Sequence, residues 1–83
     1  MNGTLANVIG MMGSVTLVIG YGYSNIARPV NFFLFNLLNF IGSALLLVSL
    51  IVHFNLAVLL LELLWMALAL FGMIRHRPGR GAP

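Results

Sequence analysis

Residues 30–74 read VNFFLFNLLNFIGSALLLVSLIVHFNLAVLLLELLWMALALFGMI, and only His53 and Glu62 interrupt the apolar character of this stretch. As a single α-helix, its 45 residues would measure about 68 Å, roughly twice the hydrocarbon core of a bilayer. The stretch must therefore fold back on itself. Its least apolar tetrapeptide, residues 53–56, divides it into two predicted spans at about 31–52 and 57–74.

A third apolar stretch precedes these two spans. Residues 4–23 carry no charge, and the chain shows neither the basic n-region nor the cleavage pattern of a secretory signal peptide. Lipid offers no hydrogen-bond partner to exposed backbone groups, and the alternating pattern of barrel strands is not visible, so we expect helices. The sequence predicts an all-α integral membrane protein. Residues 1–83 form one unit of three transmembrane helices with a basic tail at 75–83.

The composition excludes several other classes of protein. Hydrophobic residues make up 61% of the chain and charged residues 6%, whereas about a quarter of a soluble domain is charged. Without cysteine there is no disulfide scaffold or thiol chemistry, and one acid with two histidines cannot build the usual catalytic or metal sites. We therefore expect no enzyme, no metal site and no nucleic-acid partner.

The four arginines all fall on one side of this predicted topology. Arg28 lies in the loop between the first two spans, and Arg75, Arg77 and Arg80 lie in the tail. The positive-inside rule places that side in the cytoplasm and the N-terminus outside. The same arginines are suited to contact with anionic lipid headgroups.

Small and polar residues are spaced for close helix packing. The first span has one row of small residues every four positions and a second row beside it, and the second span has a polar arc of about 140°. Such rows let two helix backbones approach each other, either within one chain or between subunits. The residues expected to pack helices are Ala6, Gly10, Gly13, Ser14, Gly20, Asn39, Gly42 and Ser43.

The only acid, Glu62, lies on the third span, one helical turn from Trp65 and about 10 Å below the outer surface. An ionised acid inside a membrane costs roughly 2.5–3.5 kcal/mol, so we expect a neutral carboxyl bonded to Ser43, Ser49 or a hydroxyl of the first span. One interpretation is a structural polar contact. The alternative is a proton or cation site, or polar network, formed by Glu62, Trp65, Ser49 and His53.

His53 follows Ser49 by four residues, and antenna polypeptides use such a spacing where a histidine ligates bacteriochlorophyll. A histidine at a helix end more commonly caps backbone carbonyls. We therefore predict no cofactor, with pigment or quinone proximity as the alternative.

The order of motifs resembles a family of small, uncharacterised bacterial inner-membrane proteins. Those proteins read L-N-x-x-G-[AS]-x-L-L, then a short turn with Asn, then E-x-x-W, after a Gly-rich first helix with Tyr near its end. Here the first motif covers residues 38–46, the turn contains Asn55, and Glu62 and Trp65 form the last motif. The resemblance extends over about residues 7–74. It implies three helices and a bacterial inner membrane, and it conveys no activity.

Two functions are consistent with these patterns. The first is a non-enzymatic small membrane protein that works through helix packing, as a homo-oligomer or as an accessory subunit of a larger bioenergetic, photosynthetic or transport complex. The second is a small oligomeric transporter or channel in which Glu62 is the proton or cation site.

Overall fold

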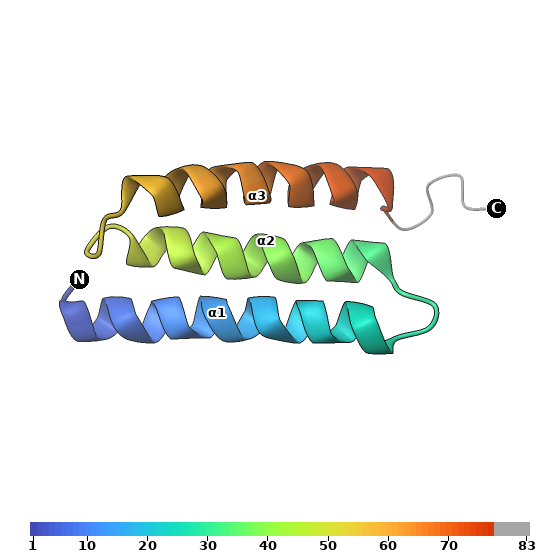
Figure 1. The fold of residues 1–83 in the computed structure, drawn as a ribbon, viewed down its shortest axis with the longest axis horizontal. Coiled ribbons are helices and arrows are strands. Elements are labelled where there is room, and N and C mark those ends of the chain that lie inside the picture. The colour runs from blue at the N-terminus through green and yellow to red at the C-terminus, as the bar shows by residue number, and fades with distance from the viewer. Residues whose placement is uncertain (78–83) are drawn as a thin grey trace.

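The computed structural model describes residues 1–77 and contains three α-helices in that range: α1 (Gly3–Ile26), α2 (Phe32–Ser49) and α3 (Leu56–Arg75). Each is long and apolar enough to cross a membrane. They run antiparallel in an elongated unit of 48 × 22 × 19 Å (Figure 1). The predicted all-α fold with three potential membrane spans is confirmed.

Each helix begins after an asparagine that caps its first turn. The side-chain Oδ1 atoms of Asn2, Asn31 and Asn55 accept hydrogen bonds from backbone N–H groups three residues later, at 2.7, 3.1 and 3.1 Å. These N–H groups have no partner inside the helix, so a polar cap on each contributes about 1 kcal/mol to stability. The caps set where the three helices begin.

The helix ends differ from the predicted spans by up to three residues. The first helix continues to Ile26 and ends two residues before Arg28, where a helical conformation is disfavoured because Pro29 follows. The second helix ends at Ser49, and the next residues close a tighter turn in which Ile51 N–H bonds to Val48 O. Because residues 50–52 are themselves apolar, composition could not distinguish this turn from the helix, and the predicted span was too long at this end.

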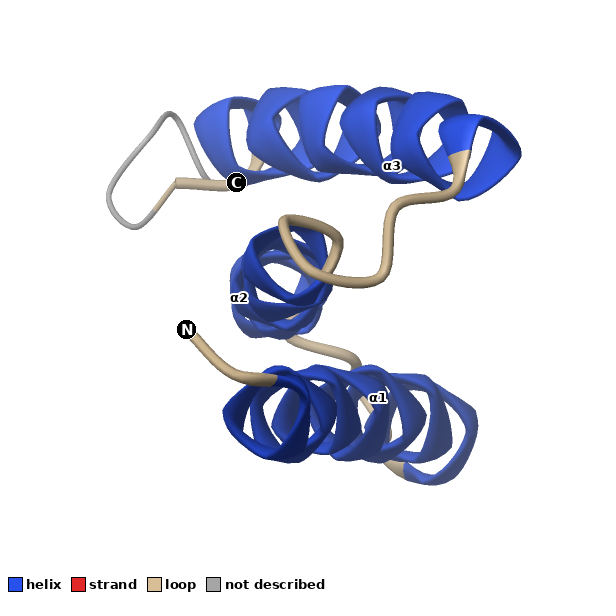
Figure 2. Cartoon of the chain, turned by 90° about the vertical axis from the view of Figure 1, so that its left-hand side faces the viewer, coloured by secondary structure: helices blue, strands red, loops and turns tan. Residues whose placement is uncertain are grey.

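The central helix of the structure is α2. Both α1 and α3 pack against it, and in the described residues they do not pack against each other. Figure 2 shows α1 and α3 extending to the same side of α2, so that one long side of the molecule is open between them. The interior of the protein therefore consists of two separate helix interfaces that share α2.

Glycines form the interface between α1 and α2. A Cβ atom built on Gly13 would lie 2.6 Å from the carbonyl oxygen of Gly42, and one built on Gly42 would lie 2.9 Å from the oxygen of Gly13. A Cβ on Gly20 would meet Leu38 at 3.2 Å. Because these positions lack side chains, the two backbones approach each other closely, which is the main source of packing energy between helices in lipid.

Candidate functional site: the polar interface between α2 and α3

Polar side chains line the contact between α2 and α3. Going along α2, the residues that face α3 recur at intervals of three and four positions, which keeps them on one side of the helix. On α3, the residues that meet them follow the same spacing in the opposite direction. We call this set the polar interface; it consists of Asn36, Asn39 and Ser43 of α2 with Glu62, Trp65 and Gly72 of α3.

The deepest pair in the polar interface is Ser43 and Glu62. Ser43 is fully buried and Glu62 is 7% exposed, with the Ser43 hydroxyl beside the carboxyl group. Yet Ser43 Oγ and Glu62 Oε2 are both buried and neither makes a hydrogen bond within the described residues. Leaving a buried polar group without a partner costs about 1–3 kcal/mol. The nearest polar neighbour of the buried carboxyl is therefore the Ser43 hydroxyl across the interface between α2 and α3.

Trp65 is tied to α2 by its indole nitrogen. Nε1 donates to Oδ1 of the buried Asn39 at 3.4 Å, while the amide nitrogen of Asn39 donates to the Phe35 carbonyl at 3.1 Å. The Trp65 side chain is otherwise 45% exposed, so its ring lies at the edge of the interface. Beside it is a hollow of about 200 Å³ lined by Phe35, Asn36, Asn39, Trp65, Leu68 and Ala69.

Two residues predicted for the same polar network lie elsewhere. Ser49 faces α1, where its hydroxyl would lie 2.9 Å from a Cβ on Gly10, so it does not lie beside Glu62. His53 is exposed in the turn after α2, with Nε2 3.5 Å from the Gly3 carbonyl oxygen. Of the four predicted network residues, the structure brings Glu62 and Trp65 into one interface and leaves the other two outside it.

The predicted helix-packing residues divide between the two interfaces. Asn39 and Ser43 lie on the α3 side of α2, whereas Gly42 lies on its α1 side. Ser14 belongs to neither, because its side chain is exposed and its hydroxyl donates to the Gly10 carbonyl at 2.9 Å. The remaining predicted positions lie on α1. Gly10, Gly13 and Gly20 face α2, and Ala6 is buried.

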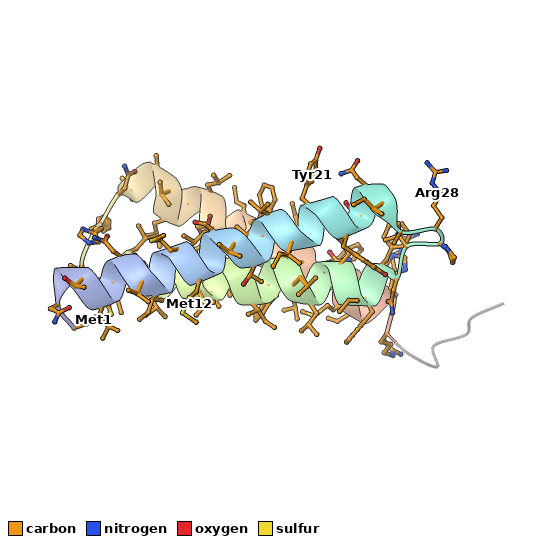
Figure 3. All side chains as sticks on the ribbon, turned by 90° about the horizontal axis from the view of Figure 1, so that it is seen from below. Met1, Met12, Tyr21 and Arg28 are labelled. Atoms are coloured by element: carbon orange, nitrogen blue, oxygen red, sulfur yellow. The ribbon has the colours of Figure 1, made fainter. Side chains whose placement is uncertain are left out.

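The described arginines gather at one end of the molecule. Arg28 projects from the loop between α1 and α2 (Figure 3), and Arg75 is the last residue of α3 at the same end. Arg77 lies two residues further along the chain and donates to the Ile74 carbonyl at 3.3 Å. The fourth predicted headgroup residue, Arg80, lies outside the described residues.

The sequence places Asn36 on the polar arc of the second span and Gly72 on the same face of the third span as Glu62 and Trp65, but neither is among the candidate site residues predicted above. A Cβ on Gly72 would lie 2.5 Å from the side-chain amide of Asn36, so the missing side chain makes room for that amide. The signal was present: Asn36 precedes Asn39 by three residues, and Gly72 follows Trp65 by seven, which places each on the face of its site neighbour.

Comparison with known proteins places the chain in a family. The model of one protein family, a family of uncharacterised small proteins, matches residues 6–80. The chain belongs to this family. No curated protein and no solved structure gives a significant match. The family match covers α2, α3 and all of α1 except its first three residues.

Proposed function

We propose that the chain is a non-enzymatic protein of the bacterial inner membrane that works by packing its helices against other transmembrane helices, as a homo-oligomer or as an accessory subunit of a larger complex. The observation that carries this proposal is the open arrangement of the fold. Both α1 and α3 rest on α2 alone, and 17–22% of the residues in each potential span are buried. Much helix surface is left available for other helices.

Polar groups on that surface support assembly further. In lipid, apolar side chains gain little from leaving acyl chains for a neighbouring helix, so association depends on close backbone packing and on interhelical hydrogen bonds. The half-exposed Trp65 and the hollow beside it lie on the surface of the polar interface and offer such a contact.

The proposed orientation follows from the arginine end of the molecule. The loop that carries Arg28 and the end of α3, where Arg75 is the last residue, lie at one end of the molecule, while the N-terminus and the turn after α2 lie at the opposite end (Figure 1). By the positive-inside rule the arginine end faces the cytoplasm and the N-terminus faces outward. Reporter fusions at the two termini test this orientation. Activity of both reporters in the same compartment would contradict it.

The test of the function is to extract the native protein in a mild detergent and to measure the mass of the particle by native mass spectrometry. We expect a particle larger than one chain, containing either further copies or another membrane protein. A particle of a single chain, in detergent and after reconstitution at high protein density, would contradict the proposal.

A second candidate function is favoured by the buried pair of Ser43 and Glu62. Two unpartnered oxygen atoms beside each other at this depth are suited to binding a proton or a small cation, as in a small oligomeric transporter. The test is flux through proteoliposomes containing Glu62→Gln, with Ser49→Ala as the matched control on the other side of α2. Unchanged flux in Glu62→Gln would rule this function out.

A further inference from the structure

The polar side chains between α2 and α3 all lie in one half of that interface. Ser43, Asn39 and Asn36 follow one face of α2 toward the arginine end of the molecule, and the matching half of α3 runs from Glu62 to Gly72. At the arginine end α2 begins and α3 ends (Figure 1). The polar groups therefore lead from the buried carboxyl toward one surface of the molecule.

The other half of the same interface is apolar. By helical spacing, Leu47 and Leu50 continue the face of α2 that carries Ser43, and Val58 and Leu59 precede the buried acid of α3 by one turn. All four of these apolar side chains are partly buried. Because none of them can bond to water, they separate the carboxyl from the opposite end of the molecule.

The polar half contains oxygen atoms without hydrogen-bond partners. Within the described residues, the buried atoms Ser43 Oγ and Glu62 Oε2 make no hydrogen bond. The amide nitrogen of Asn36 donates to the Phe32 carbonyl at 2.7 Å, but its Oδ1 has no partner in the same part of the chain. Buried polar groups of native proteins are nearly always paired, with ordered water where no protein group is available. Acyl chains cannot supply such a bond.

The hollow beside Trp65 lies on this line of polar groups. Its volume is about 200 Å³, and the amides of Asn36 and Asn39 both face it. A water molecule takes up about 30 Å³ in the liquid, so the hollow has room for more than one. Gly72 keeps the interface open next to it, since a Cβ there would lie 2.5 Å from the Asn36 amide.

The spacing of the polar groups suits water molecules that bridge them. At 1.5 Å per residue, Ser43 lies about 6 Å along α2 from Asn39, and Asn39 lies about 4.5 Å from Asn36. One water that bonds to two groups spans about 5–6 Å. Asn36 itself lies about 6 Å from the first residue of α2, Phe32, which is exposed together with His76 at the end of α3. A few waters would therefore connect the surface with Ser43.

We propose that water enters the interface between α2 and α3 from the arginine end, while the opposite end stays closed to water. This route, which passes Asn36 and Asn39 and ends at the pair of Ser43 and Glu62, is called the entry path. It lies inside one chain and does not depend on assembly. A neighbouring helix packed over Trp65 would cover the hollow toward lipid and leave the end of the path open.

The entry path gives the only acid of the chain a connection to one side of the membrane. A carboxyl exchanges its proton with the water that reaches it, so Glu62 exchanges protons with the side that the arginine end faces. This holds whether or not anything crosses the membrane. For the second candidate function, it identifies the side from which a proton enters.

Single cysteines test the entry path, because the chain contains none of its own. Asn36→Cys and Asn39→Cys place a thiol on the path. Leu47→Cys is a control in the apolar half of the same interface. Ile41→Cys is a control on the lipid-facing side of α2, where the isoleucine is 43% exposed at a depth close to that of Asn39.

The reagent is a charged methanethiosulfonate that does not cross membranes, added to one side of sealed vesicles at a time. Arg28→Cys and Phe54→Cys, at the two exposed ends, identify which end of the protein faces the reagent. Since the thiolate is the reacting species and forms in contact with water, we expect both path positions to react from the Arg28 side at least about tenfold faster than the two controls. Reaction from the Phe54 side would overturn the entry path, and so would equal rates at path and control positions, which would mean that acyl chains fill the hollow.

A second measurement keeps the indole of Trp65 as the probe and needs no cysteine. As the chain has one tryptophan, its Nε1–H gives a single indole signal whose exchange with deuterium is followed by nuclear magnetic resonance. Asn36→Leu puts an apolar side chain of similar size on the path, so we expect exchange to slow several-fold. Leu47→Ala, in the apolar half, should leave the exchange rate unchanged. Equal exchange in Asn36→Leu and the original chain would overturn the entry path.

These outcomes are separate from the test of the proposed function. The mass of the native particle reports assembly, and neither thiol reaction nor indole exchange depends on it. A single-chain particle with reactive path positions would contradict assembly and support the entry path. A larger particle whose path positions react no faster than the controls would support assembly and overturn the entry path.

Discussion

Replacing Gly13 with alanine tests whether the close backbone contact that this glycine permits stabilises the packing of α1 against α2. The new Cβ would lie 2.6 Å from the Gly42 carbonyl oxygen and 3.0 Å from Leu45 Cβ. Contacts between carbon and a carbonyl oxygen are comfortable at about 3.3–3.6 Å, so the two helices must separate by roughly 0.7–1.0 Å. Backbone atoms cannot rotate away from this contact as a side chain could.

The expected magnitude comes from comparison with a glycine that has free space. A Cβ on Gly22, also in α1, would meet nothing within 4 Å. Both substitutions gain a similar preference of alanine over glycine for helix, about 1 kcal/mol, and this gain cancels in the difference. Overpacking typically costs about 1–3 kcal/mol. Gly13→Ala should therefore be less stable than Gly22→Ala by about 1–3 kcal/mol.

The measurement is reversible unfolding in detergent micelles, followed by circular dichroism as sodium dodecyl sulfate replaces a mild detergent. The original chain and Gly22→Ala serve as references. Gly42→Ala, whose Cβ would lie 2.9 Å from the Gly13 oxygen, should shift the transition in the same direction. Equal free energies of unfolding for Gly13→Ala and Gly22→Ala would refute the close-packed α1–α2 interface.

Substitutions at three further positions probe the α3 cap and the polar interface by the same titration. Asn55→Ala should lower the free energy of unfolding by about 1 kcal/mol through loss of the α3 cap, and Asn55→Ser should restore most of it; no difference between the two variants would contradict the capping role. Gly72→Ala should lower the free energy of unfolding by less than Gly13→Ala does, because the new Cβ meets the movable side chain of Asn36 instead of backbone. An equal loss for the two variants would show that the Asn36 amide is held rigidly. Asn39→Leu removes the acceptor of the only tryptophan, Trp65, so its fluorescence emission should shift to shorter wavelength with a loss of about 0.6 kcal/mol, and unchanged emission would contradict the bond.

The number of spans was predictable because it depends on composition summed over long segments. Two apolar stretches, one of them too long for a single crossing, determine three helices regardless of how those helices pack. The grouping of Arg28 with Arg75 at one end follows from the same count, since two antiparallel helices, α2 and α3, lie between the loop of Arg28 and Arg75. The predicted spans named no capping residue, although Asn31 and Asn55 each stand directly before an apolar run.

The sequence predicted that small residues let α1 pack closely against another helix, but it did not predict which of them face α2. The pattern shows that α1 can pack closely, yet it does not distinguish Ser14 from Gly13, its neighbour in the chain. The structure places Gly13 against α2 and leaves Ser14 exposed. The same uncertainty affects Ser43 and Ser49, which were equivalent candidates to lie beside Glu62.

The sequence by itself determined the apolar character of the chain, the helical form and the number of potential spans, because each depends on the hydropathy of whole segments. Only the tertiary structure decided that α2 is central, that Ser43 instead of Ser49 lies beside Glu62, and that one side of the fold is open. Helical periodicity relates the residues of one helix to each other but does not orient that helix toward its neighbours. In water, burial of apolar side chains supplies that orientation; in lipid, a leucine is equally well placed against an acyl chain or another helix, so packing alone supplies it.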